Sequence, residues 1–203
     1  MNPSDKGQRF RALHDAPEAF VIANAWDAGS AKLLARIGFQ ALATSSGAQA
    51  GTLGRVDGQV SREEALAHAR AIVEATDLPV SADLEKDFGD APGDAAETIR
   101  RAAGVGLVGA SIEDATGDRA RPLYDPEHAA ERIAAAVEAA RAVNFPFMLT
   151  ARTENDLRGN PDLVPLHRGF DGLRWAALIL HQSPWTRRCR GKREPAWPGP
   201  FGW

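Results

Sequence analysis

Cysteine is almost missing from this chain of 203 residues, since Cys189 is the only one. A lone cysteine excludes an internal disulfide and is typical of a reducing compartment, so we expect a cytoplasmic protein. Long apolar runs are missing too, and none approaches the roughly twenty residues that span a bilayer. Residues 1–9 are polar without an apolar core, so we expect neither a signal peptide nor a membrane location.

Excess charge of one sign is also absent. The formal net charge is −3 at pH 7, which gives no reason to expect nucleic acid or a membrane surface as a partner. Hydrophobic residues make up 44% of the chain and charged residues 25%, as in ordinary globular proteins. The length is sufficient for one domain with a sizeable core.

The composition changes abruptly near residue 160. Residues 1–159 hold 17 Lys/Arg against 24 Asp/Glu and one tryptophan, whereas residues 160–203 hold 7 against 3 and four tryptophans. Enrichment in Arg, Trp, Pro and Gly is typical of out-of-frame GC-rich coding sequence. We therefore interpret residues 161–203 as an atypical, poorly ordered tail that follows a truncation or change of reading frame near residue 163.

Strand and helix patterns alternate up to about residue 154. Strands are predicted over 20–25, 41–45, 78–82, 105–112 and 145–151, and helices over 28–37, from Ser61 onward, 93–103 and 126–143. A glycine-rich loop is predicted from Gly47 to Gly58. Five βα units imply a parallel sheet. The apolar run 175–181 is long enough for one strand or two helical turns.

Two parallel architectures fit this pattern, a doubly wound open sheet and a (β/α)8 barrel. Polar or charged residues end nearly every predicted strand, which favours the barrel because its ligand site draws on all strand ends. A complete barrel needs about 250 residues. We therefore predict an incomplete (β/α)8 barrel of the TIM type over residues 1–160.

Acidic residues gather where consecutive strands are predicted to end. Asp83 and Glu85 lie two residues apart and so share one face of a strand, and Glu113 closes the next strand. Asp57 lies in the long loop after the second strand. Carboxylate oxygens from converging strand ends are suited to Mg²⁺, held largely through water. Taken singly, each acid is more simply a surface residue or a helix cap.

Two further features lie at predicted strand ends. Arg152 can clamp a carboxylate or phosphate, or form an ion pair with Glu113 or Glu154. The segment from Thr44 to Gly47 offers hydroxyl and backbone N–H groups to an oxyanion.

With these residues the chain resembles the isocitrate lyase/phosphoenolpyruvate mutase superfamily. The matching runs occur in order with similar spacing: 24–28, 43–47, 82–85 with Phe88 and Gly89, 109–114, and 151–154. The resemblance covers roughly residues 8–163. It implies a (β/α)8 barrel, Mg²⁺ with Mn²⁺ as an alternative, and a small anionic 2-oxo acid, enolpyruvate or dicarboxylate substrate. It also implies a homo-oligomer with a swapped C-terminal helix, which this chain lacks.

The resemblance also implies roles for individual residues. Asp83 would bind the metal directly, while Asp57, Glu85 and Glu113 would hold metal-bound waters. The substrate carboxylate and oxo oxygen would be bound by Ser45, Ser46 and Gly47, and its anionic end by Arg152. We expect the catalytic residues to be Arg152 and Glu113.

Departures from the family pattern bear on the reaction. The Lys-Lys/Arg-Cys-Gly-His loop of isocitrate and methylisocitrate lyases is missing, which argues against a true isocitrate lyase and leaves mutase, hydrolase and other lyase activities open. Lys86 and Asp87 stand where relatives usually have a small residue and then glycine. A non-catalytic remnant of the family is the alternative, and an anion- or nucleic-acid-binding module using residues 187–193 ranks last.

Overall fold

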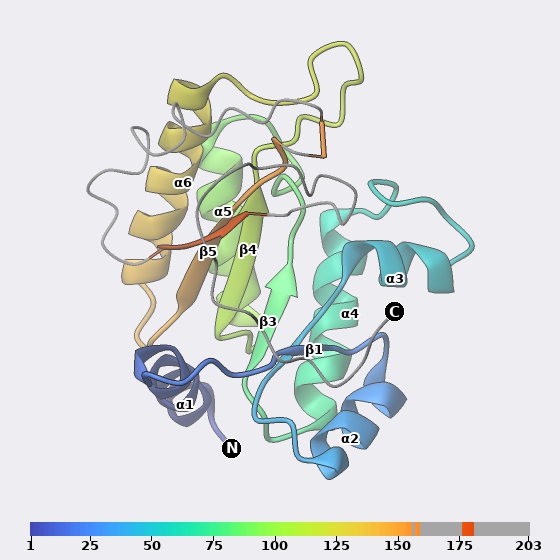
Figure 1. Cartoon of the computed structure of the whole chain (residues 1–203), viewed down its shortest axis with the longest axis vertical. Coiled ribbons are helices and arrows are strands. Elements are labelled where there is room, and N and C mark those ends of the chain that lie inside the picture. The colour runs from blue at the N-terminus through green and yellow to red at the C-terminus, as the bar shows by residue number, and fades with distance from the viewer. Residues whose placement is uncertain (156, 159–175, 181–203) are drawn as a thin grey trace, which may run out of the picture.

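The computed structural model describes residues 1–155, 157–158 and 176–180, and its centre is one parallel β-sheet (Figure 1). The strands are β1 (Ala23–Asn24), β2 (Leu42–Ala43), β3 (Val80–Asp83), β4 (Gly109–Glu113), β5 (Met148–Thr153) and β6 (Ala176–Leu180). They are hydrogen-bonded in sequence order from β1 to β6, and every pair is parallel.

This order decides between the two predicted architectures. A doubly wound sheet reverses its strand order at a switch point, whereas a (β/α)8 barrel adds each strand beside the previous one. The sequential order therefore confirms a TIM-barrel-type fold, of which the described strands form an arc. The run 175–181 contains β6, one strand more than the pattern before residue 154 indicates. The rest of the predicted tail lies outside the described residues.

The helices of the described residues are α1 (Pro3–Asp15), α2 (Ala28–Ile37), α3 (Ser46–Thr52), α4 (Arg62–Ala75), α5 (Pro92–Gly104) and α6 (Pro126–Arg141). Four of them begin close to their predicted positions, but α1 and α3 were not predicted. Helix α3 occupies the start of the predicted glycine-rich loop. The Ser45 hydroxyl accepts a hydrogen bond from the Ala48 N–H, and this N-cap starts the helix despite its glycines.

Side chains alternate between the two faces of the sheet. Val80, Ala82, Ala110, Ile112 and Leu149 are buried in the main hydrophobic core, together with apolar residues of α4, α5 and α6. Most of the intervening residues of β3, β4 and β5 are polar and only partly buried, although Gly109 is buried and Met148 is apolar. Right-handed crossovers place the connecting helices on one face, so the opposite face is left to the polar residues.

Helix α1 lies at the end of the sheet where the strands begin (Figure 1). Phe10 of α1 is buried in a small second cluster with Ala41 and Val108, each of which lies just before a strand. The amino-terminal end of the sheet is thus covered by apolar packing. Its carboxyl-terminal end carries the charged residues. No helix among the described residues is long and apolar enough to cross a membrane.

Replacing Ile112 by alanine is expected to cost about 2–5 kcal/mol of unfolding free energy, because it leaves a cavity between β4 and the helices. Ile112 is 1% exposed. Ile37, which is 65% exposed at the end of α2, provides the control, and Ile37→Ala should change stability by less than about 0.5 kcal/mol. Urea unfolding followed by circular dichroism measures both. Equal losses in the two variants would contradict this assignment of the core.

Candidate active site

A cavity of about 470 Å³ follows the polar face of the sheet from α1 to the carboxyl ends of β2, β3 and β5. Phe10 and His14 of α1 line it at one end, and Ser81, Ser111 and Thr150 line it along the strands. Asp57, Asp83 and Arg152 line it together with the segment 43–47. The cavity therefore brings together most of the residues that the sequence pattern singled out.

Asp83 is held firmly at the end of β3. Its Oδ2 accepts hydrogen bonds from the Ser46 N–H at 3.2 Å and the Ser46 hydroxyl at 3.0 Å, and its Oδ1 accepts one from the Glu85 N–H at 3.2 Å. The Asp83 N–H in turn donates to the Thr44 hydroxyl at 3.0 Å. Three hydrogen bonds orient the carboxylate and a fourth fixes its backbone, as a direct metal ligand requires.

Asp57 and Glu85 approach the site beside two glycines. A methyl group placed on Gly47 would lie 3.6 Å from Oδ2 of Asp57, and one on Gly58 would lie 4.0 Å from Oε2 of Glu85. These are ordinary contact distances, and Asp57 lines the same cavity as Asp83 at the end of β3. Burial, then the charges of Asp57 and Asp83, raise the pKa of Glu85 to about 7.

Arg152, at the end of β5, is the cation among these acids. One of its terminal nitrogens lies 3.6 Å from Oε2 of Glu113 and 3.9 Å from Oδ2 of Asp83, and the other donates to Glu154. Burial opposes the charge on Arg152, but the surrounding acids outweigh that effect and raise its pKa. Both ion pairs that the sequence suggested for Arg152 are therefore present.

Among the predicted site acids, Glu113 has the pKa that is raised most. Burial raises its pKa to about 8, nearby Glu154 adds to the rise, and Arg152 opposes it. Asp83 and Glu85 contribute smaller repulsions. Arg152 offsets only part of the repulsion between these poorly solvated carboxylates, and such a perturbed cluster is typical of functional sites.

Glu154 and Asp114 support Arg152 from behind. Glu154 is 3% exposed and binds both Arg152 and Arg158, the latter at 2.9 Å. Asp114 accepts hydrogen bonds from the Glu154 N–H at 2.8 Å and the Thr153 hydroxyl at 2.9 Å. This network fixes the end of β5 and thereby the direction of the Arg152 side chain. Asp114 was not predicted as a site residue, and Glu154 only as an ion-pair partner.

The predicted oxyanion segment is partly engaged by the protein itself. Ser45 caps α3, and Ser46 donates its N–H and hydroxyl to Asp83. Gly47 lies beside Asp57. All three line the cavity. In this structure Ser46 therefore positions the principal carboxylate, while a substrate role for the segment stays a prediction.

The donor set fits a metal held mainly through water. Among the described residues, no three or more Asp, Glu, His or Cys side chains form a group that could bind one ion directly. One fixed carboxylate with three others around it is nevertheless an all-oxygen environment, and Mg²⁺ usually keeps several waters. The mutual repulsion of these acids also favours a divalent cation between them.

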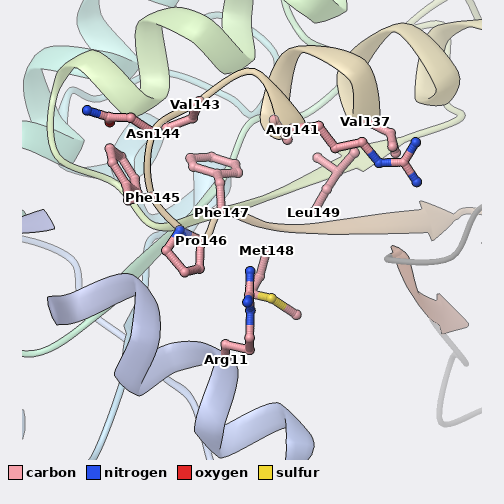
Figure 2. Close-up of a pocket in the computed structure, with 11 residues that line it drawn as sticks. Arg11, Val137, Arg141, Val143, Asn144, Phe145, Pro146, Phe147, Met148 and Leu149 are labelled. Atoms are coloured by element: carbon pink, nitrogen blue, oxygen red, sulfur yellow. The ribbon is translucent and has the colours of Figure 1, made fainter. Parts of the chain in front are cut away.

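A second cavity, of about 460 Å³, lies at the opposite end of β5 (Figure 2). It is bounded by Arg11 of α1, the turn that precedes β5, and Val137 and Arg141 of α6. The described residues that line it include no acid, and most are apolar. This cavity offers neither metal ligands nor a cluster of titratable groups, so the first cavity is the candidate active site.

The raised pKa of Glu113 predicts a pH-dependent stability in metal-free protein. Glu113 binds its proton more tightly when folded, so unfolding becomes easier as pH rises from about 5 to about 8. Glu113→Gln has no charge to bury. Its free energy of unfolding should therefore exceed that of wild type by on the order of 2 kcal/mol at pH 8.5 and differ little from it at pH 5. Chemical unfolding in EDTA measures this.

Glu97 is an exposed acid on α5 and supplies the control, because Glu97→Gln should show no such pH-dependent gain. Parallel pH profiles for wild type and Glu113→Gln would contradict the burial of a charged group at this position.

Comparison with known proteins identifies the family of this chain. The family model for phosphoenolpyruvate phosphomutase matches residues 10–167. The 2,3-dimethylmalate lyase of Eubacterium barkeri is 34% identical over 154 residues, which are 72% of this chain and 52% of that protein. The chain thus spans about half the length of the curated relatives it matches.

Two solved structures are similar in fold. A protein of Burkholderia cenocepacia J2315, assigned provisionally as a lyase/mutase, is 52% identical with a TM-score of 0.79, and the match covers 82% of this chain and 63% of that one. Phosphonopyruvate hydrolase in complex with oxalate and Mg²⁺ is 23% identical with a TM-score of 0.82, covering 92% and 65%. Together with the family match, these likenesses show that the chain belongs to the phosphoenolpyruvate phosphomutase family, within the phosphoenolpyruvate mutase/isocitrate lyase superfamily.

Proposed function

We propose that this chain carries the site of a Mg²⁺-dependent lyase or phosphonomutase-type enzyme that acts on a small 2-oxo acid, enolpyruvate or dicarboxylate through an enolate. The observation that carries the proposal is the convergence of Asp57, Asp83, Glu85 and Glu113 at one end of the sheet, where Arg152 lies beside Asp83 and Glu113. A purely structural cluster would not need so many mutually repelling acids beside a cavity.

Asp83 would hold the metal directly, because its carboxylate is already oriented by Ser46 and Glu85. Asp57, Glu85 and Glu113 would hold the waters around it. When bound, Mg²⁺ supplies a Lewis acid that stabilises the negative charge of an enolate. Mn²⁺ takes the same oxygen ligands and is a plausible substitute.

Arg152 would bind the anionic end of the substrate. Its guanidinium lies on the cavity wall and is kept charged by three acids, so it is already directed by the protein before a ligand enters. Such preorganisation saves the reorientation that a free side chain would need. Glu113 holds a proton near neutral pH when no metal ion is bound, and it would release that proton as the metal binds.

The segments around the site narrow the reaction only in part. The chain carries Lys86 and Asp87 after Glu85 and Arg119 and Arg121 in the segment after β4, and no cysteine in either place. An acid/base cysteine is therefore not part of these segments. We infer that the reaction is of the lyase, mutase or hydrolase type and uses no cysteine from these two segments.

The first test is thermal unfolding with and without Mg²⁺, with oxalate added as an enolate mimic. A ligand present at a hundred times its Kd stabilises by about 2.7 kcal/mol, or roughly 5–10 °C for a chain of this size. Wild type should show this rise, and Asp83→Asn should lose it. Glu97→Gln should respond like wild type, because Glu97 pairs with Arg100 on the exposed side of α5.

If wild type unfolds cooperatively but its melting temperature does not change with Mg²⁺ and oxalate, the proposal is overturned and the non-catalytic remnant is favoured. A rise that survives in Asp83→Asn would place the metal elsewhere. Strong salt dependence of binding to a nucleic acid would instead favour the third alternative.

Arg152→Lys should weaken oxalate binding about ten- to a hundredfold while the response to Mg²⁺ alone persists. Lysine keeps the charge but loses the planar pair of donors that binds a carboxylate. Isothermal titration calorimetry of oxalate into Mg²⁺-loaded protein measures the change. Arg141→Lys, at the second cavity, is the matched control, and an equal loss there would contradict a specific role for Arg152.

A further inference from the structure

The segment that joins β3 to α5 has an unusual backbone. Glu85, Asp87 and Phe88 have φ angles of 51°, 69° and 61°, in the left-handed region that glycine prefers. None of the three is a glycine. Such conformations persist only where the surrounding structure imposes them. Because Glu85 is one of the proposed metal-site acids, whatever imposes this backbone also places Glu85.

Side chains from three helices hold the carbonyl groups of this segment. Arg132 of α6 donates to the carbonyl oxygens of Lys86 and Gly89, the latter at 3.1 Å. Thr98 of α5 donates to the carbonyl of Asp87 at 2.8 Å, and Arg62 of α4 donates to the same oxygen at 3.3 Å. Arg132 is the residue that spans the left-handed stretch, since its two acceptors flank Asp87 and Phe88.

Arg132 is enclosed in a way that leaves it few alternatives. It is 1% exposed, and its guanidinium carbon lies 4.3 Å from the ring centre of Tyr124. The nearest acid is Asp87, which is fully buried and whose Oδ2 lies 3.9 Å from Arg132. Neither carboxylate oxygen of Asp87 has a hydrogen-bond partner. Asp87 therefore satisfies none of the Arg132 donors, which are left for the loop carbonyls.

We propose that Arg132 is a positioning residue for Glu85, which it acts on by holding the segment 86–89, in which Asp87 and Phe88 are left-handed. The inference rests on the proposed metal site, although the loop restraint itself exists without metal. The buried Asp87, in a conformation suited to glycine, makes the restraint necessary. A glycine at position 87 would remove the side chain that strains the backbone.

The test combines two readouts on the full chain. Hydrogen exchange of the amides of residues 84–90, without metal, reports the order of the loop, and calorimetry with Mg²⁺ alone reports affinity. Arg132→Met should speed exchange in this segment at least tenfold and weaken Mg²⁺ binding at least tenfold. Arg101→Met, which breaks only an exposed ion pair with Glu63, should change neither.

The decisive variant is the double change Asp87→Gly with Arg132→Met. If Arg132 acts by restraining a strained loop, glycine at position 87 relieves the need for it, and both readouts should return to within about threefold of wild type. A merely structural role for Arg132 predicts no such rescue. Arg132→Lys, which can reach one carbonyl at a time, should give intermediate values and serves where Arg132→Met fails to fold.

The two proposals fail in different ways. Wild type that binds no Mg²⁺ would overturn the metal site, while faster exchange in Arg132→Met and its rescue would still support the loop restraint. Wild type that binds Mg²⁺, with exchange and affinity unchanged in Arg132→Met or Arg132→Lys, would overturn the role of Arg132. Loss of both readouts without rescue by Asp87→Gly would also overturn it.

Discussion

The central electrostatic constraint is that one partly buried cation faces several acids at the carboxyl ends of β3, β4 and β5. Arg152 contacts Glu113 and Glu154 and lies 3.9 Å from Asp83. Burial, together with the charge of Glu154, raises the pKa of Glu113 to about 8, and one guanidinium only partly opposes that rise. The site therefore carries unbalanced negative charge that a divalent cation would offset. That imbalance is what distinguishes it from an ordinary ion-pair network.

Strand parity explains why these groups meet. In a parallel strand, alternate residues face opposite sides, so apolar Ala82 and Ile112 pack on the helices while Asp83 and Glu113 lie on the opposite face of the sheet. The register pairs Glu113 with Arg152 on the neighbouring strand. The same alternation that builds the core thus places charged residues at the carboxyl ends of the strands. The apolar contacts of α1 cover the opposite end of the sheet, so the carboxyl ends are left for a ligand.

Sequence reasoning could find the strands, the barrel order and the acids, because each depends on local periodicity or on residues at strand ends. It missed α1, for which it recognised no pattern, and α3, since the glycines between residues 47 and 58 indicated a loop whereas the cap at Ser45 starts a helix. It also gave Ser46 a substrate role, although its donors are engaged by Asp83. Contacts between distant segments, such as Asp114 with Glu154, follow from the fold and leave only the weak signal of polar residues after a strand.

Asp87, which stands where relatives usually have glycine, shows how the fold accommodates a departure from the family pattern. A non-glycine residue with a positive φ and a buried carboxylate without hydrogen bonds are each unfavourable, so the rest of the fold has to supply the compensation. Here it comes from Arg132, which lies forty-five residues later in the chain and meets the loop only because α6 packs beside α5. The sequence displays the substitution, but its consequence depends on helix packing. Local rules that fail beside a functional site therefore point to the residues that hold that site in place.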